Sequence, residues 1–167
     1  MLVAHAPAGY IIAKKMKNKE KSLIIASMIF AVLPDVDLIY YYLFDKTKTF
    51  HHLYFTHLPI VLLGSFLVLQ MLLMMLPKDG FEKKFKPYFY LFYINWFVHL
   101  LLDTVTGGIA WLYPFNAEVI KLIKIPEISS SWMVSFVFHW SFLIELVIVA
   151  YAIVLFIKAR NQKRRGV

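Results

Sequence analysis

The sequence predicts an all-α integral membrane protein that forms a single helical domain over residues 1–167. Two properties of the composition support this fold class. Hydrophobic residues make up 60% of the chain and charged residues only 17%, against about 25% charged in an ordinary soluble domain. The third observation is a series of apolar runs of the length that a helix needs to cross a bilayer core about 30 Å thick. Together they exclude a disordered chain and an ordinary soluble domain.

Four transmembrane helices are expected, over residues 22–44, 58–76, 88–113 and 132–157. The second and fourth are the most uniformly apolar, and Glu145 is the one formally charged residue of the fourth. The first and third are interrupted by Asp, His, Pro or Gly. These two spans are therefore expected to carry the chemistry of the protein.

The two ends of the chain are expected to differ in character. Residues 1–13 are apolar but too short to cross a bilayer, and they lack the basic start and small-residue exit of a cleavable signal. They are interpreted as a retained N-terminal half-helix. Residues 158–167 are strongly basic and are expected to form a cytoplasmic tail.

The positions of Lys and Arg predict the orientation in the membrane. With four spans, 14 of the 18 basic residues fall on one side and 4 on the other, and short cytoplasmic segments are the ones enriched in such residues. This predicts a multi-pass protein with a cytoplasmic C-terminus. The net charge of +8 is then explained by orientation and by attraction to anionic lipid, and nucleic acid is not expected as a partner.

Polar residues within the predicted spans form a short group. Each intramembrane Asp costs about 2.5–3.5 kcal/mol on insertion scales, so each needs a partner or a function. By the predicted topology these residues lie at a similar depth, towards the extracytoplasmic side. The group, with the two histidines of the adjoining outer loop, comprises His5, Asp35, Asp37, His52, His57, His99 and Asp103.

The spacing within this group is typical of a metal site. His99 and Asp103 are four residues apart and share one helix face, while Pro34 loosens the helix beside Asp35 and Asp37. Three Asp residues without a Lys or Arg in the spans leave negative charge that a divalent cation would neutralise. Because cysteine is absent, any metal must be held by nitrogen and oxygen. The predicted metal ligands are His5, Asp35, His52, His57, His99 and Asp103.

The nitrogen-rich ligand set favours zinc, with manganese or iron as alternatives. Asp35 and Asp37 are the predicted catalytic residues. Three roles remain open for Asp37: a bridging ligand, a partner that orients a histidine, or the base that takes a proton from metal-bound water.

Three further residues are additional candidates for the site: Thr56, His139 and Glu145. His139 lies between Phe138 and Trp140, where a packed and hydrogen-bonded histidine is the simpler interpretation. Glu145 could equally pair with a neighbouring helix. His51 is interpreted as a residue of a solvated loop.

The order of these motifs resembles the YdjM-like family of predicted membrane-bound metal-dependent hydrolases, also described as LexA-binding, inner-membrane-associated hydrolases. The resemblance implies an inner-membrane location, a metal-dependent activity and, by the family description alone, a protein partner of the LexA type. It also implies a distant similarity to zinc-dependent phospholipase C. The shared positions are His5 with Gly9, Leu33–Asp37, His52 with Thr56 and His57, and His99 with Asp103, Gly107 or Gly108, and Pro114.

The third motif departs from the family pattern. Leu53, Tyr54 and Leu58 stand where the family has Arg, Gly and Ser. If the family arginine contacts a substrate phosphate, this chain lacks that contact.

The leading functional hypothesis is a metal-dependent hydrolase, phosphoesterase-like, that uses metal-activated water to cleave a phosphoester of a lipid or lipid-linked substrate. One alternative is a transporter or channel for a divalent cation or protons, which would need polar residues along the whole membrane depth. Another is a structural or partner-binding membrane protein in which the metal ties helices together, which would need a fully ligated, closed site.

Overall fold

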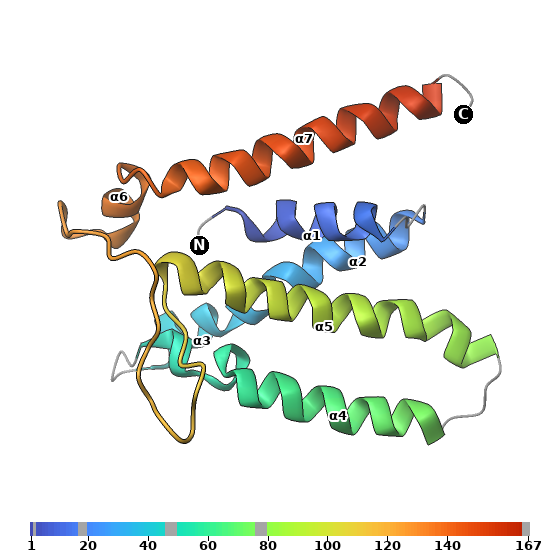
Figure 1. Cartoon of the computed structure of the whole chain (residues 1–167), viewed down its shortest axis with the longest axis horizontal. Coiled ribbons are helices and arrows are strands. Elements are labelled where there is room, and N and C mark those ends of the chain that lie inside the picture. Colours follow the sequence, from blue (N-terminus) through green and yellow to red (C-terminus); the bar gives the residue numbers. More distant parts are fainter. Residues whose placement is uncertain (2, 17–19, 46–49, 76–79, 165–167) are drawn as a thin grey trace.

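The computed structural model describes residues 1, 3–16, 20–45, 50–75 and 80–164, and within these the chain is helical, which confirms the all-α class. One isolated antiparallel bridge pairs Ile109 with Ile120. In Figure 1 the long helices run side by side, and the short turns, α3, α6 and the loop after α5 gather at one end of the bundle. The helices are α1 (His5–Lys15), α2 (Lys21–Val32), η1 (Leu33–Val36), α3 (Asp37–Leu43), η2 (His51–Leu53), η3 (Phe55–His57), α4 (Pro59–Met75), α5 (Gly80–Thr106), α6 (Trp132–Val137) and α7 (Phe142–Arg164).

Two helical stretches are long and apolar enough to cross a membrane. They are Lys21–Leu43, with 23 residues and a mean hydropathy of 2.0, and Phe142–Gln162, with 21 residues and a mean hydropathy of 2.5. A third apolar helix, Pro59–Met75, is shorter. It coincides with the expected span 58–76, whose last residue lies outside the described residues.

Two of the expected spans have other bounds as helices than the hydropathy predicted. The helix α5 begins at Gly80, before the expected start at Tyr88. The helix expected over residues 88–113 ends at Thr106, because Gly108 adopts a φ of +99°, a conformation that glycine accepts without strain and that ends a helix. The helix expected over residues 132–157 is broken between Val137 and Phe142.

The break between α6 and α7 has a side-chain cause. His139 Nδ1 lies 2.9 Å from Ser141 Oγ and accepts the Ser141 backbone N–H at 3.3 Å. Such local bonds from side chain to backbone compete with the helical ladder. The apolar run is therefore divided into a six-residue helix and a 23-residue helix.

The N-terminal half-helix is present as α1, which begins at His5 and ends at Lys15, and Leu2 lies outside the described residues. Several basic residues used to predict the orientation also lie outside the described residues: Lys17, Lys19, Lys46, Lys48, Lys78 and Arg165. The same applies to residues 165–167 of the predicted tail; the rest of the tail begins in the last turns of α7.

A buried polar contact joins three helices near the middle of the bundle. Ser27 Oγ of α2 donates to the Gly9 carbonyl of α1 at 2.7 Å, and Asn95 Nδ2 of α5 donates to Ser27 Oγ at 2.8 Å. Ser27 and Asn95 are fully buried. We call these three residues the Gly9–Ser27–Asn95 contact. It fixes α1, α2 and α5 against one another, as small and polar residues do between membrane helices.

Gly9 allows α1 and α2 to approach this closely. A Cβ atom at Gly9 would lie 2.5 Å from the Ser27 carbonyl oxygen and 2.9 Å from Ala31 Cβ. We expect Gly9→Ala to force the helices apart and to lower the free energy of unfolding by about 1–3 kcal/mol, the usual cost of overpacking. Thermal unfolding in detergent measures this change.

Gly64→Ala is the matched control, because a Cβ atom at Gly64 of α4 meets no atom within 4 Å. Replacing a glycine inside a helix without a clash is neutral or stabilising, by up to about 1 kcal/mol. An equal effect of the two substitutions would contradict the role assigned to Gly9.

Candidate metal centre

The six predicted metal ligands lie together at the end of the bundle that carries α3. They come from five segments that are distant in the sequence: α1, η1, η2, η3 and α5. All but one are almost completely buried; the exception is Asp35, whose side chain is 22% exposed. The six residues are His5, Asp35, His52, His57, His99 and Asp103.

Asp103 is the centre of this group. Its Oδ1 lies 3.3 Å from His5 Nε2, and its Oδ2 lies 3.1 Å from His99 Nε2. His57 Nε2 and His52 Nε2 are 3.6 and 3.8 Å from the same Oδ2. The α-amino group of Met1 also contacts Oδ1. Four imidazoles thus present the same ring nitrogen to one buried carboxylate.

Asp35 faces three of the same nitrogens from the other side. Its Oδ1 lies 3.5 Å from His99 Nε2 and 3.7 Å from His57 Nε2, and its Oδ2 lies 3.9 Å from His5 Nε2. Pro34 is the second residue of the short 3₁₀ turn η1, which follows α2 and carries Asp35 towards the histidines. The partial exposure of Asp35 makes it the open side of the centre.

The rings of His52 and His99 are held by backbone carbonyl groups. His52 Nδ1 lies 2.8 Å from the Gly108 oxygen, and His99 Nδ1 lies 2.8 Å from the Ala31 oxygen. Both Nδ1 atoms therefore carry the proton and donate it, which leaves each Nε2 with a lone pair that faces the centre. Gly107 makes the room for His52, since a Cβ atom there would lie 2.3 Å from His52 Cε1.

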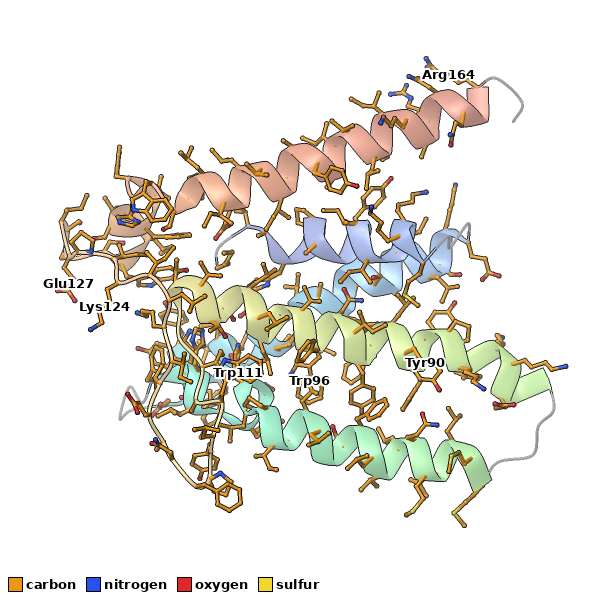
Figure 2. The ribbon with its side chains drawn as sticks, viewed as in Figure 1. Tyr90, Trp96, Trp111, Lys124, Glu127 and Arg164 are labelled. Carbon is orange, nitrogen blue, oxygen red and sulfur yellow. The ribbon has the colours of Figure 1, made fainter. Side chains whose placement is uncertain are left out.

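His57 is oriented by a carboxylate in place of a carbonyl group. Its Nδ1 lies 2.7 Å from Asp37 Oδ2, and the same oxygen accepts a hydrogen bond from Thr56 Oγ1 at 2.5 Å. The Thr56 carbonyl in turn accepts the indole N–H of Trp96 at 2.6 Å, and Figure 2 shows Trp96 between α5 and α4. Of the three roles left open for Asp37, the geometry favours the residue that orients a histidine.

The electrostatics of the centre favour a bound cation. Burial disfavours the charged form of His57, but the three neighbouring carboxylates outweigh it and raise the pKa of His57 to about 10. At His52 burial outweighs the attraction of the Asp103 carboxylate and lowers the pKa to about 3. His52 therefore stays neutral and able to bind a metal.

The residues fit a divalent metal ion. With both Nδ1 atoms donating, the Nε2 atoms of His57 and His99, which face each other at 3.2 Å, need a cation between or beside them. The raised pKa of His57 supplies a proton there in the metal-free protein, and a metal ion would take the place of that proton. Both ring nitrogens of His5 and Oδ2 of Asp103 are buried without a hydrogen-bond partner, which is costly in the absence of an ion. Two sets of possible ligands are present, and within each set the ligand atoms lie within 4.8 Å of one another. The first set is His5, Asp35, His99 and Asp103, and the second is His51, His52 and His57.

The family of the chain follows from a comparison along its whole length. The model of the YdjM inner membrane protein family matches residues 1–165. The chain belongs to this family. The YdjM match extends past Pro114 to the last turn of α7, beyond the region in which the sequence motifs lie. Membership of an inner membrane protein family agrees with the two long apolar helices.

Comparison with curated proteins and with solved structures gave no match. For this YdjM family member the similarity to zinc-dependent phospholipase C therefore stays a prediction.

His51 belongs to this centre, although the sequence assigned it to a solvated loop. Its side chain is 20% exposed, and its Nδ1 lies 3.7 Å from Asp37 Oδ1. Its position directly before His52 in the turn η2 brings it to the same side as His57. The signal in the sequence was the adjacent pair of histidines itself.

The three additional candidates have different positions. Thr56 supports Asp37, as described above. His139 bonds Ser141 within its own turn and packs against Trp140; in the described part of the chain it pairs with none of the site carboxylates. Glu145 is fully buried on α7, and its Oε2 accepts the Val3 backbone N–H at 2.5 Å, which ties α7 to the segment that precedes His5.

Proposed function

We propose that the chain is a membrane-embedded, metal-dependent hydrolase that cleaves a phosphoester of a lipid or lipid-linked substrate. The observation that carries this proposal is the approach of His57 Nε2 and His99 Nε2 to 3.2 Å between the carboxylates of Asp35 and Asp103. Such a buried, negatively charged set of nitrogen and oxygen ligands is typical of sites for zinc, manganese or iron.

His5, Asp35, His99 and Asp103 would hold one divalent ion, and His51, His52 and His57 form a second set of ligands. Zinc is favoured by the number of imidazoles. When bound, a divalent ion supplies a water of lowered pKa and neutralises charge that develops on a phosphoryl oxygen.

Two carboxylates have different tasks in this proposal. Asp35 is the partly exposed one, so it is the group in reach of an attacking water and of the proton that this water gives up. Asp37 holds His57 through Nδ1 and stabilises the ring as a ligand. Leu53 offers no charge to a phosphate, so substrate charge has to be neutralised by the metal centre.

The distribution of buried residues supports a one-sided site over a transport path. Among the described residues whose side chains are fully buried, the polar ones that continue inward from the centre end at the Gly9–Ser27–Asn95 contact. Beyond it the packed residues are apolar: Ala13, Leu23 and Leu91 are buried at 0%, 6% and 0% exposure. A cation or proton path would need polar groups through this layer.

The membrane topology that accompanies this function is also a proposal. Four spans with a cytoplasmic C-terminus would place the metal centre at the extracytoplasmic end of the bundle, at the depth of lipid head groups. The excess of Lys and Arg on the opposite side supports this orientation.

Metal content tests the proposed function. We expect the purified protein to retain stoichiometric zinc, and His99→Ala to lose it, because His99 contacts both Asp35 and Asp103. His139→Ala is the control, since His139 lies in an apolar segment but bonds only within its own turn. Elemental analysis after dialysis gives the result.

The proposal also requires that hydrolysis of a lipid phosphoester depends on added zinc. Absence of bound metal in the wild-type protein under zinc-replete conditions would overturn it. Metal that binds without hydrolysis, in a centre with no open coordination position, would support the alternative of a metal that ties helices together.

A further inference from the structure

An apolar groove lies on the surface between α1, α2 and η1. It has a volume of about 380 Å³, within the range of small-molecule sites, about 300–1,000 Å³. Four of its residues expose 40–56% of their surface, so the groove is open along its length. It is lined by Ala6, Met28, Ile29, Val32, Leu33 and Val36.

The groove adjoins the metal centre at one end. Ala6 follows His5 in the chain, and Leu33 and Val36 are the first and last residues of η1, the turn that carries Asp35. Asp35 is also the most exposed of the six predicted ligands. The open side of the centre and the end of the groove are therefore formed by the same two segments.

The length of the groove agrees with part of one lipid leaflet. Met28 and Val36 are eight residues apart, which corresponds to about 12 Å along a helix at 1.5 Å per residue. One leaflet of the hydrocarbon core is about 15 Å deep. From the level of Asp35 the groove thus runs inward along Lys21–Leu43, one of the two stretches able to cross a membrane.

We propose that this groove binds one acyl chain of a glycerophospholipid whose phosphate lies at the metal centre. This inference rests on the proposed function, and it assigns the substrate class of that site. The argument for a substrate, as opposed to bulk lipid, is that the groove ends at the turn that carries Asp35. A lipid whose acyl chain lies in the groove would have its own phosphoester beside this partly exposed carboxylate. The length and the volume favour a single acyl chain over a long polyprenyl chain.

Photo-crosslinking tests the groove without a measurement of activity. The probe is phosphatidic acid with a diazirine group in one acyl chain, added to the full chain in phosphatidylcholine vesicles, with and without zinc. We expect peptides that contain Ile29 and Val32 to carry about fivefold more label than the α4 peptide that contains Leu67, since such a ratio corresponds to about 1 kcal/mol of preferential binding.

Two groove variants and one matched control sharpen the test. Ile29→Trp and Val32→Trp should fill the groove and lower its labelling about fivefold, while bound zinc is unchanged. Leu67→Trp should leave the labelling of α2 as it is, because Leu67 is 57% exposed, against 56% for Ile29, but lies outside the groove. Equal labelling of α2 and α4, or no effect of either groove variant, would overturn the inference.

Competition with unlabelled compounds identifies which kind of molecule the groove binds. Unlabelled phosphatidic acid should remove the label, whereas hexadecane, which has no phosphate, should not. Stronger competition by undecaprenyl phosphate would overturn the assignment to an acyl chain. Because zinc is measured in the same samples, bound zinc with uniform labelling refutes only the groove, and groove labelling without any bound zinc refutes only the proposed function.

Discussion

Asp103→Asn is expected to abolish metal binding and hydrolysis together. Among the described residues, Asp103 is the one carboxylate within 3.1–3.8 Å of four imidazole Nε2 atoms, so its replacement removes the common partner of the set. Even a group that only supports a ligand changes metal affinity about 10–100-fold, and we expect a loss greater than about 100-fold here. Titration with zinc and a turnover assay on vesicles measure the two effects.

The stability of the same variant provides an independent check. In the metal-free protein Asp103→Asn should be less stable than the wild type, because the Asp103 carboxylate contacts the Met1 α-amino group and lies 3.6 Å from the His57 ring, and removing one partner of a buried ion pair costs about 3–5 kcal/mol. With zinc, the rise in melting temperature caused by ligand binding to the folded state should be present in the wild type and absent in the variant. Glu118→Gln, at an exposed position, is the control, and wild-type zinc affinity in Asp103→Asn would contradict the model.

Asp37→Asn is expected to weaken zinc binding about 10–100-fold, the usual result of removing a carboxylate that orients a histidine ligand. Asp37 accepts from His57 Nδ1 at 2.7 Å and from Thr56 at 2.5 Å, so the neutral amide keeps the shape of this contact but loses its charge. Thr56→Val removes only the hydroxyl donor and should have a smaller effect of the same sign.

The measurement for Asp37 has to separate positioning from folding. Zinc affinity should fall in Asp37→Asn while the melting temperature of the metal-free protein stays within a few degrees of the wild type. Excess zinc should then restore most of the turnover, which a catalytic base at this position would not permit. Turnover equal to the wild type at limiting zinc would remove Asp37 from the chemistry.

The sequence could predict that the ligands lie close together, because this depends on helix periodicity, on the position of one proline and on the lengths of the apolar runs. His99 and Asp103 share a helix face at any rotation of that helix, and Pro34 removes a backbone donor and so interrupts the regular α-helix beside two Asp residues. Their common depth followed from the lengths of the apolar runs. The structure brings His99 within 4 Å of both Asp35 and Asp103.

Other features depend on contacts that hydropathy does not describe. The break between α6 and α7 arises from the two hydrogen bonds between His139 Nδ1 and Ser141, inside a run that is apolar on both sides. The position of His51 depends on how the turn η2 packs against Asp37. The role of Asp37 depends on which nitrogen of the His57 ring it faces. The spacing of the two residues in the sequence does not determine this.

The Gly9–Ser27–Asn95 contact has a consequence for metal selection. Each of its three residues lies one helical turn inward from a position in the centre: Gly9 from His5, Asn95 from His99, and Ser27 from Ala31, whose carbonyl group holds His99. The distances between the ligands are thus set by helix packing before any ion arrives. A metal centre with fixed ligand positions favours the ion whose preferred coordination geometry matches those positions, so selection does not depend on intrinsic affinity alone. Gly9→Ala loosens this packing one turn away from the ligands, so the distances between the ligands are less tightly fixed. We therefore expect the variant to be less selective among zinc, manganese and iron, although it keeps all six ligand residues.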